Sequence, residues 1–321
     1  MRKPQNHCAQ KRNNMSLKIQ EHVVLAPFTT FNIGGPARYL CEVRNEEDVK
    51  EGLEWGKSHG MKFVLLAGGS NVLIPDSGLD ALVMHIVEGS HTFDDDVVTA
   101  DFGCNLLALI RDAGTRSLGG WEKLSGIPGS IGGAVRGNAG AFGTEMKDIV
   151  TYVRALNTKT GKVKDFTNAE CAFSYRHSFF KDNPQWVILR VQVRLAQGQQ
   201  ESIATSIEAT IAERERRHLQ DVQAAGSFFM NPVAPKAIVD LFEKEKGVLS
   251  REGRVPAGWL IEKAGLKGAK VGGAVASEQH PNYIVNTGGA SANDVLRLAL
   301  RIKREVFDRF GVKLKEEAAV F

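Results

Sequence analysis

The sequence predicts an α+β protein built from more than one compact unit. Its 321 residues exceed the length of one average domain. The first third alternates apolar strands with a helical segment, the middle third carries strands of alternating polarity, and helical periodicity dominates the last third. Glycine is concentrated in residues 117–146, which distinguishes this stretch from the rest of the chain.

The first third is predicted to form a small α/β unit. A strand is expected over 38–43, a helix over 45–59, and further strands over 63–67 and 81–87. Asn45 can cap the helix, and the acidic residues after it suit the positive end of the helix dipole. The second strand runs directly into a glycine loop, which is where α/β units bind ligands.

The middle third is predicted to be largely antiparallel sheet. Residues 186–195 alternate between aliphatic and polar side chains, as a half-buried antiparallel strand does. The other elements expected here are a strand over 97–101, a helix over 106–113, and a hairpin of strands over 149–157 and 161–166.

The last third follows a polar break at 196–202 and is predicted to be mainly helical. Its best-defined helix covers 291–310, where Ser291 and Asp294 form a capping-box start and Gly311 ends the helix. The remaining expectations are helices over 203–219, 235–246 and 257–263, and strands over 275–276, 282–286 and within 312–321.

Composition and charge argue against several classes of protein. Lys and Arg number 41 against 37 Asp and Glu, a balance that does not indicate nucleic-acid binding. Cys8, Cys41, Cys104 and Cys171 lie far apart, so we expect reduced thiols in the cytoplasm rather than a zinc site or disulfides. No apolar run approaches the length of a membrane span. Residues 1–20 lack the apolar core of a secretory signal and are expected to form a disordered tail.

Three glycine-containing loops are candidates for one phosphate site. They cover 33–36, 68–71 and 126–143, and none spells the G-x-G-x-x-G of a Rossmann fold or the G-x-x-x-x-G-K-[ST] of a P-loop. Exposed N–H groups in such loops form anion sites, so we expect a phosphorylated cofactor. The alternative for the longest stretch is a flexible linker. Apolar residues that require burial interrupt that stretch and disfavour a linker: Trp121, Leu124, Ile127, Ile131, Val135 and Phe142.

Polar side chains outside these loops are candidates for chemistry. Arg176, between Tyr175 and His177, can clamp a substrate carboxylate; the alternative is a surface arginine stacked on the tyrosine. Ser227 stands before two phenylalanines, where its hydroxyl can donate a proton to carbon or cap a helix. Glutamates at a chain end are usually solvated, but Glu317 becomes a functional candidate if an arginine lies beside it.

The order of these motifs resembles one enzyme family, the UDP-N-acetylenolpyruvoylglucosamine reductases. The resemblance covers about residues 21 to 321. Each motif alone is modest, whereas the ordered set is highly specific. The matching segments are TFNIGGPA (30–37), GGSNVL (68–73), GIPGSIGGA (126–134), NAGAFG (138–143), YRHS (175–178), GSFFMNP (226–232) and LIEKAGLKG (260–268).

The resemblance implies a two-subdomain FAD-binding fold of the vanillyl-alcohol-oxidase (PCMH) type, followed by an α+β domain that binds the substrate. It divides the chain into a tail (1–20), two FAD-binding subdomains (21–90 and 91–202) and the substrate-binding domain (203–321). The last strand, within 312–321, is expected to return to the active site.

The resemblance also implies a reaction. NADPH reduces bound FAD, and flavin N5 then passes a hydride to UDP-N-acetylglucosamine enolpyruvate. The product, UDP-N-acetylmuramate, is a precursor of peptidoglycan. We expect a cytoplasmic enzyme with small-molecule partners and no nucleic acid, membrane, metal or obligate protein partner. Two alternatives stay open: a flavin oxidoreductase of this fold that acts on an alcohol or hydroxy acid, and a non-catalytic regulator that binds a UDP-sugar or flavin.

Matching positions imply three catalytic residues. Ser227 would protonate carbon, Arg176 would hold the charge that develops on the substrate carboxylate, and Glu317 would assist Arg176. Two departures from the family pattern affect this set. Met230 stands where the family usually has Lys, and no Pro separates Glu316 from Glu317, so the sequence leaves both glutamates as candidates.

Matching positions also imply the binding residues. The chain has no long insertion after 175–180, so it resembles the shorter subtype without a lid over the substrate. The UDP-sugar would be bound by Tyr175, Asn231 and His280. FAD would be bound by Ile33, Gly34, Gly35, Ala67, Gly68, Gly69, Ser70, Asn71, Gly126, Ile127, Pro128, Gly129, Gly132, Gly133, Asn138, Ala139 and Gly140.

Overall fold

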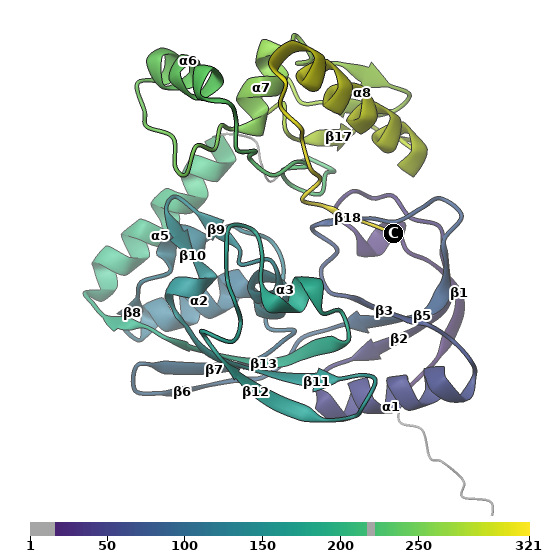
Figure 1. Cartoon of the computed structure of the whole chain (residues 1–321). Helices are drawn as coiled ribbons and strands as arrows, with labels where there is room; N and C mark the ends of the chain where they lie inside the picture. The colour runs from purple at the N-terminus through teal and green to yellow at the C-terminus, as the bar shows by residue number, and fades with distance from the viewer. Residues whose placement is uncertain (1–16, 217–221) are drawn as a thin grey trace, which may run out of the picture.

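The computed structural model describes residues 17–216 and 222–321, which form two sheets with their helices and a C-terminal helical unit above them (Figure 1). The predicted α+β class is confirmed. Residues 1–16 of the predicted disordered tail lie outside the described residues. Its last residues are predicted wrongly, because Leu17 is 8% exposed in the core and β1 (Gln20–Val24) already belongs to the first sheet.

The first sheet confirms the predicted α/β unit. Its strand order is β1-β2-β5-β3. The strands β2 (Pro36–Val43), β5 (Leu79–Ile86) and β3 (Phe63–Leu66) are parallel, and β1 is antiparallel to β2. α1 (Glu46–Ser58) connects β2 to β3, and the side chain of Asn45 accepts a first-turn backbone hydrogen bond of 2.9 Å.

The second sheet is antiparallel throughout, as predicted, with the order β12-β11-β13-β7-β6. Its central strand is β13 (Trp186–Arg194), in which the aliphatic residues are buried and Arg190 and Arg194 are exposed. The antiparallel pairing and this alternation confirm the predicted strand. The other strands are β12 (Val163–Thr167), β11 (Val150–Asn157), β7 (Val97–Asp101) and β6 (His91–Asp94).

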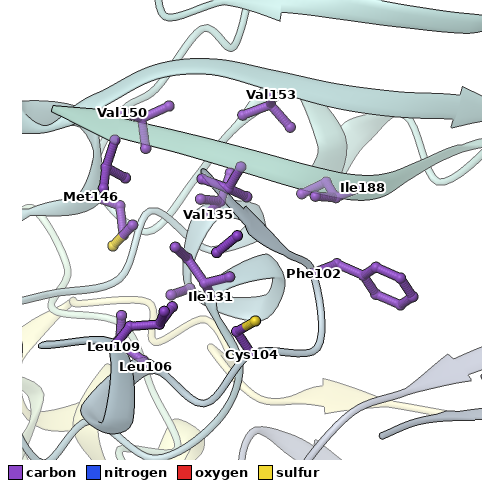
Figure 2. Packing of buried hydrophobic residues seen from close by; sticks show 14 of the residues in the cluster. Phe102, Cys104, Leu106, Leu109, Ile131, Val135, Met146, Val150, Val153 and Ile188 are labelled. Carbon is purple, nitrogen blue, oxygen red and sulfur yellow. The ribbon is translucent and has the colours of Figure 1, made fainter. Parts of the chain in front are cut away.

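The glycine-dense stretch crosses the core of the molecule. Within it, α3 (Ile131–Arg136) packs on β13 and β7. Figure 2 shows Ile131 and Val135 of α3 among Val150, Val153 and Ile188 of the sheet. Burial at this density excludes the flexible linker. Among the six residues expected to be buried, Trp121, Leu124, Ile131 and Val135 are buried and Ile127 is partly buried, whereas Phe142 is 46% exposed and was predicted wrongly.

The predicted start of the last unit at residue 203 does not match the packing. α5 (Gln200–Arg216) packs against α2 (Leu106–Thr115), and its residues Ile203 and Ile207 belong to the same hydrophobic cluster as the second sheet. We therefore propose that the second unit ends with α5. The predicted end of this helix, 217–219, lies outside the described residues.

The C-terminal unit contains α6 (Lys236–Lys246), α7 (Ala257–Lys263) and α8 (Ala292–Phe310). The predicted capping box at the start of α8 is confirmed, and Gly311 ends the helix with φ = 65°. A small antiparallel sheet of β15 (Lys270–Val271), β16 (Ala274–Ala276) and β17 (Ile284–Asn286) packs on α8.

The chain end returns to the first unit, and the strand expected within 312–321 is short. Only β18 (Ala319–Val320) is a strand, and it pairs in parallel with β4 (Val72–Leu73) (Figure 1). Phe31, Ile33 and Leu73 of the first unit are buried in the core of the C-terminal unit. The shorter elements are β8 (Leu118–Gly119), β9 (Gly140–Ala141), β10 (Thr144–Glu145), β14 (Ala196–Gln197) and α4 (Phe179–Asp182).

Residues 17–216 and 222–321 lack two features, a helix that could span a membrane and a cluster of metal-ligating side chains. No helix there has the length and apolar character needed to cross a bilayer. No group of three or more His, Cys, Asp or Glu side chains there can hold a metal ion. Cys41, Cys104 and Cys171 are free and buried.

Candidate active site

The three predicted glycine loops lie side by side. The N–H of Thr30 donates to the carbonyl of Gly69 (3.2 Å), and the hydroxyl of Ser70 donates to the carbonyl of Pro128 (3.1 Å). Strand β3 delivers the second loop and the turn before α3 delivers the third. The loops 68–71 and 126–143 are thus in direct contact, and the segment just before 33–36 reaches them through Thr30. That the three loops surround one pyrophosphate stays a prediction.

Two of these glycines are required by protein neighbours. Gly69 has φ = 59°, and a Cβ there would collide with the carbonyl oxygen of Phe28. A Cβ on Gly35 would collide with the carbonyl oxygen of Asp76. Both glycines thus allow backbone segments to approach each other, which holds the loops in place.

The open side of these loops suits a pyrophosphate. Gly68, Asn71 and Gly133 are exposed and Ser70 is partly exposed. In the structure three of them donate within the protein: the Ser70 hydroxyl to the carbonyl of Pro128 (3.1 Å), the Gly133 N–H to the Ser130 hydroxyl (3.3 Å) and the Asn71 amide to the carbonyl of Glu317 (3.4 Å). The Asn71 amide keeps a second N–H, which a phosphate oxygen can accept. That these loops bind the phosphates of FAD stays a prediction.

Other predicted FAD residues have partners within the protein. The Asn138 amide donates to Glu145 (3.0 Å) and to the carbonyl of Ser174 (2.9 Å), so it ties two loops together. Ile33 is buried in the C-terminal core, and the N–H of Gly132 donates to Phe102 (3.0 Å).

Arg176 and Glu317 form the charged centre of the site. Arg176 Nε lies 3.0 Å from Glu317 Oε1, and Arg176 Nη2 donates to the carbonyl of Gly140 (2.8 Å). Arg176 has φ = 54°, a left-handed conformation that is costly for a residue with a Cβ. Lys181 donates to the carbonyl of Arg176 (3.0 Å), which stabilises this conformation.

Burial perturbs the titration of this group. It raises the pKa of Glu317, while the positive charges of Arg176 and Lys181 act in the opposite direction. Burial likewise lowers the pKa of Lys181 and raises the pKa of Tyr175. Such perturbation is common among residues that act in catalysis.

The two tail glutamates have different partners. Glu316 pairs with Lys303 of α8 (2.9 Å), whereas Glu317 faces Arg176. The geometry thus favours Glu317 as the functional glutamate. His177, another titratable group of the arginine motif, pairs with Asp182 (3.0 Å) away from this centre.

The loop that carries Ser227 is held by one buried amide. The Asn282 side chain accepts from the N–H of Phe229 (3.0 Å) and donates to the carbonyl of Phe229 (2.8 Å). The N–H of Glu317 donates to the carbonyl of Phe228 (2.8 Å). One hydrogen bond thus joins the serine loop to the glutamate beside Arg176.

A cavity of about 490 Å³ opens beside Ser227. Three predicted site residues, Ser227, Asn231 and His280, share it, although they come from distant parts of the C-terminal unit. Among the other residues that line it, Glu262 belongs to the motif LIEKAGLKG. The rest lie outside the matching motifs: Lys246, Pro256, Gly258, Trp259, Pro281 and Asn282.

Tyr175 connects the cavity to the charged centre. Its hydroxyl accepts a hydrogen bond from the N–H of Asn231 (3.3 Å). Arg254 lies over its ring, with Cζ 4.4 Å from the ring centre. Sequence reasoning missed Lys181 and Arg254, because no motif distinguishes them from surface cations.

Comparison with known proteins gives one consistent family. A family model for the C-terminal domain of UDP-N-acetylenolpyruvoylglucosamine reductase matches residues 217–321, and one for an FAD binding domain matches 37–167. The UDP-N-acetylenolpyruvoylglucosamine reductase of Pseudomonas putida is 36% identical over 340 residues, which cover 96% of this chain and 100% of that protein. The one from Carboxydothermus hydrogenoformans is 36% identical over 314 residues, covering 95% of each chain.

The fold agrees with the solved structure of a protein that carries this family's name. The crystal structure of UDP-N-acetylenolpyruvylglucosamine reductase from Thermus caldophilus superposes with a TM-score of 0.75 at 30% sequence identity. The match covers 95% of this chain and 99% of that one.

Proposed function

The chain belongs to the UDP-N-acetylenolpyruvoylglucosamine reductase family, and on that premise we propose how its residues carry out the reaction. It is an FAD-dependent oxidoreductase that uses NADPH to reduce UDP-N-acetylglucosamine enolpyruvate to UDP-N-acetylmuramate, a peptidoglycan precursor. The observation that supports the proposed roles most strongly is the hydrogen bond from Glu317 to the carbonyl of Phe228, because together with the Arg176–Glu317 ion pair it links Arg176 to the loop that carries Ser227.

FAD supplies the hydride that it receives from NADPH. Arg176 binds the carboxylate of the substrate and stabilises the negative charge that spreads onto it during hydride addition. Glu317 orients Arg176 from 3.0 Å and, in its protonated form, adds a donor at the same carboxylate. Ser227, half-buried just before the aromatic pair in the chain, donates the proton to the neighbouring carbon.

The cavity beside Ser227 is proposed to hold the UDP-sugar. Asn231 and His280 lie on its wall, and Tyr175 bonds to the backbone of Asn231 from the other side of the site. Lys246, which also lines the cavity, supplies a positive charge for the diphosphate. This cation replaces the charge of the lysine that the family usually has at the position of Met230.

The FAD site is proposed to lie along the glycine loops. Gly68 and Asn71 are exposed on the open side of those loops, where the second N–H of the Asn71 amide would donate to the pyrophosphate; Ser70 would join it by turning its hydroxyl away from Pro128. Asn138 and Ile33 are assigned supporting roles, because their side chains are bonded or buried within the protein.

The reaction uses small molecules, NADPH and a nucleotide sugar. We infer that it takes place in the cytoplasm, where these metabolites are kept, and that it requires no protein partner.

The decisive experiment is an absorption spectrum of the purified protein, followed by anaerobic titration with NADPH with and without the enolpyruvyl UDP-sugar. We expect a flavin spectrum that NADPH bleaches and that the UDP-sugar restores. Rapid turnover with oxygen and an alcohol would instead indicate an oxidase of this fold. Flavin that NADPH does not reduce would indicate a binding protein.

A further inference from the structure

Arg254 joins two of the proposed substrate-binding residues across the site. Its Cζ lies 4.4 Å from the centre of the Tyr175 ring, and its Nη1 donates to the carbonyl of Asn231 (3.0 Å). The N–H of Asn231 in turn donates to the hydroxyl of Tyr175 (3.3 Å). Each of the three residues thus contacts the other two.

This triangle spans two parts of the chain. Tyr175 precedes Arg176 in the second FAD-binding unit, whereas Asn231 follows Ser227 in the C-terminal unit. Arg176 and Ser227 must act on the same substrate from opposite units. The distance between the two units at this point therefore decides whether both groups reach it.

The backbone around Arg254 is well held. The N–H of Val255 donates to the carbonyl of Pro232, and the N–H of Ala234 donates to the carbonyl of Gly253, each at 3.0 Å. These bonds pair the segment of Arg254 with the segment that follows Asn231. The side chain of Arg254, 29% exposed, thus starts from a fixed base and reaches across to Tyr175, with its Nε 3.5 Å from Glu252 Oε2.

The chemistry of the contact suits a planar cation. A guanidinium stacks flat on an aromatic ring and can donate to a carbonyl at the same time, whereas an ammonium cannot do both in one plane. The ring of Tyr175 also has Arg176 on it, with Cζ 5.3 Å from the ring centre. Movement of Tyr175 would therefore displace Arg176.

We propose that Arg254 is a positioning residue for the reduction of the UDP-sugar: by clamping Tyr175 to Asn231, it sets the position of Arg176 relative to Ser227. This inference rests on the proposed roles of Arg176 and Ser227. Arg254 acts through its neighbours and exchanges neither hydride nor proton.

The test separates the two half-reactions. In R254M we expect reduction of the flavin by NADPH to stay within about twofold of the wild type, while reoxidation by saturating UDP-sugar slows at least tenfold, because a small displacement of reacting groups is costly. R254K, which keeps the charge without the planar fork, should lie between the two proteins. Arg116→Met is the matched control, since it removes an arginine 4.2 Å from the ring of Phe93 outside the site, and it should leave both rates unchanged.

A double-mutant cycle with Y175A gives the second measurement. If Arg254 acts through Tyr175, the Y175A/R254M protein should reoxidise no more slowly than Y175A alone. The proposal would be overturned if the losses of reoxidation rate in the two single variants were additive, or if R254M or R254K reoxidised at the wild-type rate. It would also be overturned if R254M slowed both half-reactions equally and had a lower melting temperature. Wild-type protein that does not reduce the UDP-sugar would instead refute the proposed function itself.

Discussion

The guanidinium of Arg176 and the carboxyl of Glu317 lie 3.0 Å apart, although one belongs to the second FAD-binding unit and the other to the end of the chain. The contact is an ion pair whose Nε–H is not aligned as a hydrogen bond. Two features bring the residues together: the left-handed backbone of Arg176 and the return of the chain end to the first sheet.

Replacement of Glu317 by Gln should slow reoxidation of the flavin by the UDP-sugar by about 10² or more, because a neutral amide cannot pair with Arg176 as a carboxylate does and is a weaker donor than a carboxylic acid. Reduction by NADPH should be unaffected. Stopped-flow absorbance of the flavin measures both. Glu316→Gln is the matched control, since Glu316 pairs with Lys303 instead, and its rates should equal those of the wild type. An E317Q protein with normal reoxidation would refute the role of Glu317.

The pH dependence of stability should also identify Glu317. Burial raises its pKa above the ordinary value of 4.5, so the folded protein binds this proton more tightly than the unfolded chain does. The resulting stabilisation is complete below pH 4.5 and is lost as the pH rises through the raised pKa. Gln does not ionise, so E317Q does not lose this stabilisation. As the pH rises through the raised pKa, the free energy of unfolding of E317Q minus that of the wild type should therefore increase. Urea unfolding at several pH values measures it, and a constant difference would contradict the raised pKa.

Replacement of Ser227 by Ala should leave reduction of the flavin by NADPH intact and slow proton delivery to the substrate by about 10² to 10⁴. The measurement is single-turnover reoxidation with the UDP-sugar, together with deuterium incorporation from solvent into the product. Ser202→Ala, at an exposed position of α5, is the control and should behave as the wild type. Retained reoxidation in S227A would assign the proton to another donor.

Loss of the Asn282 amide should loosen the serine loop. N282A leaves the buried N–H and carbonyl of Phe229 without their partner, which should lower the free energy of unfolding by about 1–3 kcal/mol. Reoxidation by the UDP-sugar should slow as well. N282D keeps the acceptor for the N–H but loses the donor, so we expect an intermediate effect. Chemical denaturation measures the first effect, and an N282A protein as stable as the wild type would show that the loop is held otherwise.

Substitution of Gly69 by Ala should disrupt the FAD loops. The new Cβ would collide with the carbonyl of Phe28, and the positive φ adds strain, so we expect a loss of roughly 2–4 kcal/mol of stability together with weaker flavin binding. Gly60→Ala is the matched control: its φ is similar, at 64°, but no atom lies within 4 Å of the new Cβ. It should cost only about 1 kcal/mol and leave flavin binding unchanged. Equal effects of the two changes would exclude the collision as the cause.

Most elements were predictable from the sequence because their signals are local. The capping box of α8 and the alternation of β13 depend on residues a few positions apart, and the structure confirms both. We propose that the boundary lies after α5 rather than at 203: the polar break before α5 resembles a linker, whereas the tertiary contacts of Ile203 keep this helix with the second sheet.

The sequence by itself determined the fold class, the glycine loops and the family, since ordered motifs and periodicities survive without coordinates. Only the tertiary structure decided which of Glu316 and Glu317 faces Arg176, and that Ser227, Asn231 and His280 share one cavity. The physical reason is that these choices depend on the direction of side chains after distant segments pack. Arg254 illustrates this: it has no sequence signal, yet burial and a stacked ring make it part of the site.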